Sequence, residues 1–188
     1  MLRGWLGLMW WLARPLAALG VPPDAVTVAG AGLAVGAVRA RPGAASTLLV
    51  AGAVCDGLDG AVAVHRDTVS AHGRALDHAA DRVADLAAGA LLVRRGAPAG
   101  LVGSALLFTG LLETRRDRRA PVVTVGERPS RVVCAVLGDL ACAVTGRRWP
   151  APVAASVWTA LAAVAVAQVA AAPRSSRHGS ARRRLGAR

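Results

Sequence analysis

The stretch that decides the fold is a run of aspartates set between apolar residues: positions 55–67 read CDGLDGAVAVHRD and positions 73–85 read GRALDHAADRVAD. Asp56 and Asp59 are three residues apart, and Asp77 and Asp81 are four apart, so the members of each pair share one face of a helix. Asp56 and Asp59 lie near the end of one apolar segment, and Asp77 and Asp81 lie near the start of the next. Two antiparallel helices connected in this way would bring all four carboxylates together.

The connection between these two helices is expected to be a loop that contains Gly60, Gly73 and several charged residues. Six apolar segments in total can be cut at Pro, Gly and Arg clusters, at about 25–38, 45–64, 76–93, 99–113, 131–145 and 151–172. A membrane span needs roughly 20 apolar residues, and only the last segment is both that long and uninterrupted. The pattern predicts an all-α integral membrane protein with six transmembrane helices.

The charge of the chain supports this topology. Its 188 residues are 54% hydrophobic and carry a net charge of +12, and all 23 basic residues are arginine. A chain this apolar is neither a disordered polyelectrolyte nor a typical nucleic-acid binder, so no nucleic-acid partner is expected. With the N-terminus inside, 16 arginines fall on the cytoplasmic side and 6 on the other, and Arg82 lies within the third apolar segment. The positive-inside rule then places both termini and the aspartates in the cytoplasm, with the cell membrane as the expected location.

The two ends of the chain differ from its centre. Residues 1–19 hold Trp5, Trp10 and Trp11 with Arg3 and Arg14, which is typical of an amphipathic helix lying in the membrane interface among its lipids. Residues 20–173 form the predicted six-helix membrane domain, and residues 174–188 a basic, disordered tail.

Four carboxylates on apolar helices require compensation, because each aspartate inside a span costs roughly 2.5–3.5 kcal/mol. One alternative is a purely structural network with Arg66, Arg74 and Arg82. The other is divalent metal: clustered carboxylates favour Mg²⁺ or Mn²⁺, and two ions would balance four charges and bind a phosphate-bearing substrate.

At these residues the sequence resembles the CDP-alcohol phosphotransferase (CDP-alcohol phosphatidyltransferase) family, whose signature is D-x2-D-G-x2-A-R-x8-G-x3-D-x3-D. All four acids, both glycines and the alanine match in register, and Val64 stands where the family has arginine. The resemblance implies a membrane enzyme of phospholipid synthesis. Such an enzyme moves a phosphatidyl group from a CDP-alcohol, usually CDP-diacylglycerol, to an acceptor hydroxyl and releases CMP.

The resemblance also implies roles for individual residues. The metal ligands would be Asp56, Asp59, Asp77 and Asp81, with Asp81 bridging or acting as the catalytic base. Donor-nucleotide binding would involve Gly57, Gly60, Ala63, Gly73, Asp24, Thr27 and Arg66, the last as a substitute for the missing arginine if the helix ends early. Asp24 and Thr27 belong to a P-N-x-[LI]-T-like opening at 23–27, and a plain helix N-cap is an equal alternative for either.

Residues 127–131 (ERPSR) resemble the E-R-x2-R run of members that accept a phosphorylated polyol. This makes Arg128 and Arg131 candidates for binding the acceptor, and a positive-inside loop is the alternative. The identity of the acceptor alcohol stays open, and family members are often homodimers. Because valine cannot supply the charge of the family arginine, the alternative function is a catalytically impaired homologue that binds lipid or a partner.

Overall fold

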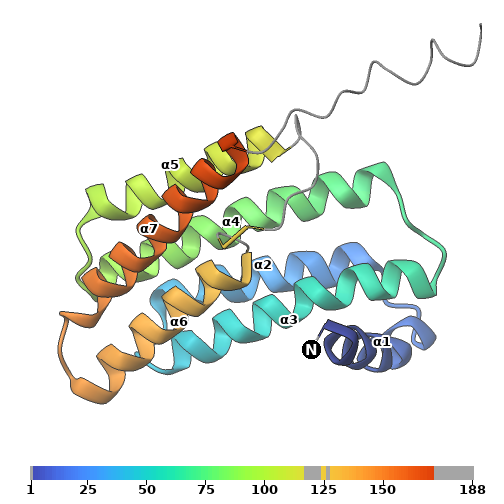
Figure 1. Cartoon of the computed structure of the whole chain (residues 1–188). Helices are drawn as coiled ribbons and strands as arrows, with labels where there is room; N and C mark the ends of the chain where they lie inside the picture. Colours follow the sequence, from blue (N-terminus) through green and yellow to red (C-terminus); the bar gives the residue numbers. More distant parts are fainter. Residues whose placement is uncertain (1, 117–123, 126–127, 172–188) are drawn as a thin grey trace, which may run out of the picture.

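Seven α-helices make up the part of the chain that the structure describes, and no β-strand occurs among its residues. The structure is a computed structural model that describes residues 2–116, 124–125 and 128–171 (Figure 1). In chain order the helices are α1 (Leu2–Ala18), α2 (Pro23–Arg39), α3 (Ala44–His65), α4 (Ala71–Arg95), α5 (Ala99–Arg116), α6 (Arg128–Thr145) and α7 (Pro150–Ala171). Every apolar segment of the sequence is therefore helical, as predicted.

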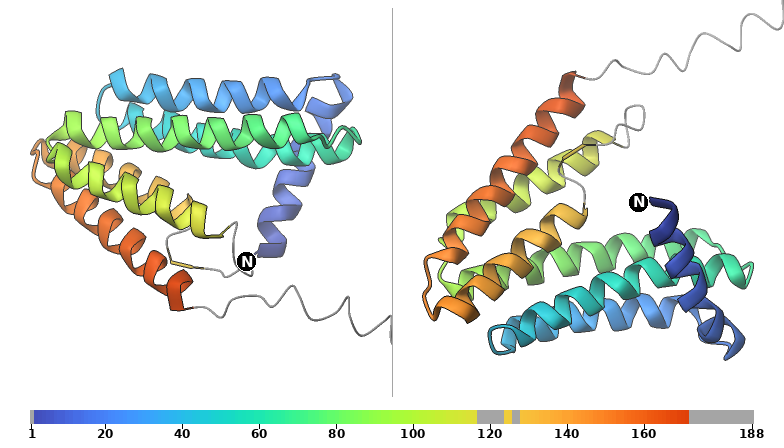
Figure 2. Two further views of the ribbon diagram at one scale, coloured as in Figure 1. Left: turned by 90° about the horizontal axis from the view of Figure 1, so that it is seen from above. Right: turned by 60° about the horizontal axis from the view of Figure 1, so that its bottom comes forward.

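The helices form two groups that meet at one end of the molecule. Helix α2 packs on α3 and on α4, and α7 packs on α5 and on α6, while α4 contacts all three members of the second group. The groups come together where the short α2–α3, α4–α5 and α6–α7 connections lie, and they diverge toward the opposite end (Figure 2). Helix α1 crosses that opposite end and packs on α3.

Small residues let the helix backbones approach closely, as is common where helices associate in lipid. A Cβ atom at Gly30 of α2 would lie 2.9 Å from Cβ of Cys55 and 3.1 Å from the carbonyl oxygen of Gly52, both in α3. A Cβ atom at Gly138 of α6 would lie 2.7 Å from Cβ of Ala154 in α7. The buried core is correspondingly rich in alanine, and Trp158 is its largest fully buried side chain.

A buried polar network fastens the end where the two groups meet. Asp139 of α6 is fully buried and accepts hydrogen bonds from the backbone N–H of Gly43 (2.9 Å) and of Ser46 (3.1 Å), and from the Ser46 hydroxyl (2.7 Å). Arg95, the last residue of α4, donates from Nε to the same carboxylate at 2.6 Å and from Nη2 to the Ala40 carbonyl at 3.0 Å. The network joins the α2–α3 connection to α4 and α6.

Membrane spans are recognisable by length and composition in a minority of the helices. Helices α3 and α7 are long and apolar enough to cross a membrane. A third candidate is the pair Met9–Ala18 and Pro23–Arg39, which is bent by 118°. The fold class is thus all-helical with two or three recognisable candidate spans, and the six-span arrangement stays a prediction.

One local prediction, the extent of the α3–α4 loop, was wrong, and one alternative, the N-cap role of Asp24 or Thr27, is excluded. Gly60 lies inside α3 and Gly73 in the first turn of α4, so the connecting loop is only residues 66–70. Helix α4 begins five residues before the predicted start because Ser70 caps it: the Ser70 hydroxyl accepts from the Gly73 N–H at 3.0 Å. Neither Asp24 nor Thr27 caps α2, since Pro22 occupies the N-cap position. The predicted basic tail lies outside the described residues.

Candidate active site

The four aspartates come from two neighbouring helices, Asp56 and Asp59 from α3 and Asp77 and Asp81 from α4. Asp56, Asp59 and Asp77 each offer one carboxylate oxygen, and these three oxygens all lie within 4.8 Å of one another. The i, i+3 and i, i+4 spacings produce this gathering because they turn each pair toward the facing helix. Three of the four predicted carboxylates therefore lie together, while Asp81 is connected to Asp56 through Arg128.

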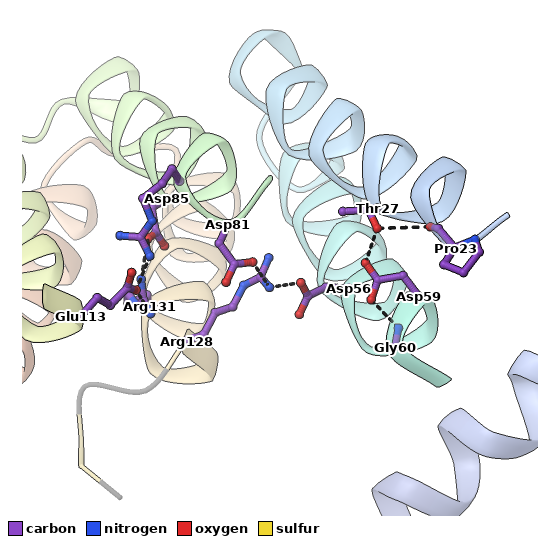
Figure 3. Close-up of polar contacts among 11 residues, drawn as sticks. Pro23, Thr27, Asp56, Asp59, Gly60, Asp81, Asp85, Glu113, Arg128 and Arg131 are labelled. Carbon is purple, nitrogen blue, oxygen red and sulfur yellow. Dashed lines mark hydrogen bonds and ion pairs between the residues drawn. The ribbon is translucent and has the colours of Figure 1, made fainter. Parts of the chain in front are cut away.

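Asp59 is held from two sides. It is buried, and its Oδ2 accepts a hydrogen bond from the Thr27 hydroxyl of α2 at 2.5 Å. Its Oδ1 accepts from the Gly60 backbone N–H at 2.6 Å. Figure 3 shows both contacts, with Thr27 and Gly60 on opposite sides of the carboxylate. The orientation of this carboxylate is thereby fixed by neighbouring protein groups.

Arg128, the first residue of α6, lies between the two acidic helices. Its Nη1 forms ion pairs with Oδ1 of Asp56 and with Oδ1 of Asp81, as drawn in Figure 3. The guanidinium therefore connects α6 to both α3 and α4 at the level of the acidic cluster. Arg128, which was predicted to bind the acceptor, therefore lies next to the carboxylates and pairs with two of them.

One turn further along α6, Arg131 is buried in a second ionic group. Its Nη1 pairs with Asp85 of α4 and its Nη2 lies 3.3 Å from Glu113 of α5, which also pairs with Arg82. The Arg131 Nε has no hydrogen-bond partner among the described residues. This second group joins α4, α5 and α6 beside the aspartates.

A cavity of about 490 Å³ opens beside Asp59 and Asp77. Six of the seven residues predicted to bind the donor nucleotide contribute to its wall: Asp24, Thr27, Gly60, Ala63, Arg66 and Gly73. Gly57 is not among its lining residues. The wall also includes Arg74 and Val69, which the sequence motif does not mark.

Val64, the departure from the family pattern, lines this cavity and is 57% exposed. Helix α3 ends one residue later, at His65, and Arg66 is its C-cap residue and also lines the cavity. Its Nη1 donates to the carbonyl oxygens of Gly20 (3.0 Å) and Val21 (2.8 Å) in the α1–α2 connection. The guanidinium group of Arg66 therefore supplies a positive charge near Val64, where the family has arginine.

The donor set fits a hard divalent cation. All the gathered ligand atoms are carboxylate oxygens, the type that Mg²⁺ and Mn²⁺ prefer. Two nearby histidines contact groups outside the aspartate cluster. His65 stacks on Trp10 with ring centroids 3.6 Å apart, and Nε2 of His72 lies 3.8 Å from Oδ2 of Asp24. Of the arginines in the structural alternative, Arg66 binds backbone carbonyls and Arg82 pairs with Asp85 and Glu113. The carboxylates of Asp56 and Asp81 pair instead with Arg128.

The all-helical fold thus carries an acidic centre suited to a divalent cation, and a cavity lies beside it. The family model for CDP-alcohol phosphatidyltransferase matches residues 23–173. The chain therefore belongs to the CDP-alcohol phosphatidyltransferase family and is a transferase of substituted phosphate groups. The family resemblance found in the sequence is confirmed.

Two solved structures of the Mycobacterium tuberculosis phosphatidylinositol phosphate synthase (PgsA1) have the same fold, each at 20% sequence identity. The one with CDP-DAG bound has a TM-score of 0.68 and covers 86% of this chain and 91% of its own. The one with manganese and citrate has a TM-score of 0.70 and covers 88% and 90%. No curated protein sequence matches this chain significantly.

Sequence reasoning missed two contributors to this region. Glu113 stands near the end of an apolar segment, and its pairing with Arg82 and Arg131 depends on how α4, α5 and α6 meet. Arg74, which the sequence analysis named only as a possible ion-pair partner of the aspartates, lines the cavity from the first turn of α4. Glu127, the first residue of the predicted acceptor motif, lies outside the described residues.

Proposed function

We propose that this chain transfers a phosphatidyl group from CDP-diacylglycerol to the hydroxyl of an acceptor alcohol and releases CMP. The observation that carries the proposal is the convergence of carboxylates from α3 and α4 beside a cavity that Arg66 and Arg74 also line. A nucleoside diphosphate needs both features, cations near its phosphates and a recess for its base and ribose. The PgsA1 structure with CDP-DAG bound supports this choice of donor.

In this proposal Asp56, Asp59, Asp77 and Asp81 hold two divalent ions, Mg²⁺ or Mn²⁺. When bound, such ions neutralise the negative charge of the pyrophosphate and of the leaving CMP. The manganese in the second PgsA1 structure supports this cofactor class. Arg128 keeps the facing carboxylates of α3 and α4 at a fixed separation through its two ion pairs.

The acceptor hydroxyl oxygen forms a bond to the phosphorus that carries the diacylglycerol, and the bond from that phosphorus to the bridging oxygen breaks. CMP leaves with the electron pair of that bond. Asp81 accepts the hydroxyl proton, which makes it the general base. Arg128 and Arg131 bind an acceptor that carries a phosphate. The Nε of Arg131, which has no hydrogen-bond partner among the described residues, supports this role.

The protein functions as a multi-pass protein of the cell membrane, with the active site and both termini on the cytoplasmic side. The bias of arginine toward one side supports this orientation. Helix α1 lies in the interface, which its bend of 118° from α2 and its exposed Trp10 and Trp11 support. A homodimer is the proposed oligomeric state, by likeness to the family.

The alternative function is a catalytically impaired homologue that binds lipid or a partner, and the exposed Val64 in the cavity wall favours it. The two functions separate in one assay of CMP release by the purified protein with CDP-diacylglycerol, Mn²⁺ and candidate acceptors. The proposal expects release that Asp77→Ala abolishes. Absence of release with every acceptor, together with normal folding, would favour the alternative.

A further inference from the structure

Thr27 lies at the closest polar contact between α2 and the acidic cluster. It is the fifth residue of α2 and is 6% exposed. Its Oγ1 lies 2.5 Å from Oδ2 of Asp59 and 3.2 Å from the carbonyl oxygen of Pro23. A threonine hydroxyl carries one proton. The shorter contact and the charge of the acceptor both direct that proton to Asp59.

The second oxygen of Asp59 is also occupied, by the Gly60 N–H at 2.6 Å. A carboxylate with a donor on each oxygen cannot rotate about its terminal bond without losing both hydrogen bonds. Each oxygen keeps a further lone pair for another partner. One oxygen each of Asp56 and Asp77 lies within 4.8 Å of an Asp59 oxygen, so a cation bound among them can use this remaining acceptor capacity.

The spacing of α2 and α3 allows so short a side chain to make this contact. Gly30, three residues after Thr27 on α2, lies against Gly52 and Cys55 of α3, where an added Cβ atom would meet Cys55 Cβ at 2.9 Å. The two backbones are therefore almost in contact one turn away from Thr27 and Asp59. Because this packing fixes the distance between α2 and α3, the hydrogen bond from Thr27 also fixes the position of the Asp59 carboxylate.

We infer that Thr27 is a positioning residue for divalent-cation binding: its hydroxyl orients Asp59 so that Asp56, Asp59 and Asp77 present their oxygens to one cation. The inference rests on the proposed function for the presence of metal, and it assigns Thr27 to Asp59 where the sequence pattern assigned it to the nucleotide. Loss of a hydrogen bond that orients a ligand typically lowers metal affinity about 10–100-fold.

The test is a calorimetric titration of Mn²⁺ into the full chain in detergent, without donor or acceptor. Thr27→Val keeps the shape of the side chain and removes the hydroxyl, and Thr27→Ala removes it with less bulk. Both variants are expected to bind Mn²⁺ about 10–100-fold more weakly than wild type, whereas Thr27→Ser is expected to stay within about threefold.

Thr109→Val is the matched control, because Thr109 of α5 is 1% exposed and its hydroxyl has no hydrogen-bond partner among the described residues. It is expected to bind Mn²⁺ as wild type does. Equal Mn²⁺ affinity of wild type, Thr27→Val and Thr27→Ala would overturn the inference. If Thr27→Val does not fold, as judged by melting without metal, the Ala and Ser variants decide the question.

The outcome is separable from that of the proposed function, because the titration contains no lipid. A chain whose Mn²⁺ binding depends on the Thr27 hydroxyl but that releases no CMP would uphold the inference and refute the transferase proposal. An active transferase whose Thr27→Val variant binds Mn²⁺ normally would uphold the transferase proposal and refute the inference.

Discussion

Replacing Asp139 by alanine is expected to destabilise the protein more than any exposed substitution. The change removes the acceptor for the N–H groups of Gly43 and Ser46, for the Ser46 hydroxyl and for Arg95 Nε. The Arg95 side chain is only 12% exposed and would lose its ionic partner. Breaking a buried ion pair by removing one partner costs about 3–5 kcal/mol.

For a chain of this length, 1 kcal/mol corresponds to a change in melting temperature of about 2–4 °C. Asp139→Ala should therefore melt roughly 6–20 °C below wild type when unfolding is followed in detergent by fluorescence or circular dichroism. Asp139→Asn keeps the volume and one acceptor oxygen, so its melting temperature should lie between those of Asp139→Ala and wild type.

The double variant Asp139→Ala/Arg95→Ala separates the charge from the remaining contacts. Because it leaves no unpaired guanidinium, it should be less destabilised than the sum of the two single variants. The reasoning would be refuted if Asp139→Ala melted within about 2 °C of wild type, or if the two single effects simply added.

Four further predictions concern the site and its supports. Asp77→Asn, which keeps the volume and removes a charged ligand, should weaken Mn²⁺ binding and reduce CMP release at least 100-fold, on the order of a lost metal ligand; unchanged release would contradict the assigned ligand set. Chelation with EDTA should abolish release and added Mn²⁺ should restore it, so release that persists in EDTA would exclude a metal requirement. Arg66→Ala should raise the KM for CDP-diacylglycerol more than it lowers kcat, whereas a variant affecting kcat alone would remove Arg66 from donor binding. Gly30→Ala should separate α2 from α3 and lower both the melting temperature and the Mn²⁺ affinity, because its methyl group would meet Cys55 Cβ at 2.9 Å; wild-type values for both would show that the helices tolerate a wider spacing.

The meeting of Asp56, Asp59 and Asp77 could be predicted from the sequence, because it depends on spacings between residues that are close together in the chain. Spacings of three and four residues fix the face of a helix, and a short connection fixes the antiparallel partner. The start of α4 was less predictable, since a single serine cap at Ser70 outweighs the glycine three residues later that suggested a loop.

The ion pairs and hydrogen bonds that could not be predicted join residues that are far apart in the sequence. Asp139 reads as one acid in an apolar helix, and its partners are 44 to 96 residues away along the chain. Glu113 likewise gains its role only where α4, α5 and α6 meet. Such partnerships depend on helix packing, which periodicity within one helix does not determine.

The proposed activity of this chain is the transfer of a phosphatidyl group from a CDP-lipid to an alcohol. The most direct measurement incubates the purified full chain with CDP-diacylglycerol, Mn²⁺ and a panel of acceptors, and quantifies both CMP and the lipid product by mass spectrometry. With one of the acceptors, CMP and a phosphatidyl-alcohol are expected in equal amounts, and the Asp77→Ala variant is expected to form neither. CMP formed without any phosphatidyl-alcohol, or no CMP with any acceptor from a folded protein that binds Mn²⁺, would contradict the proposed activity.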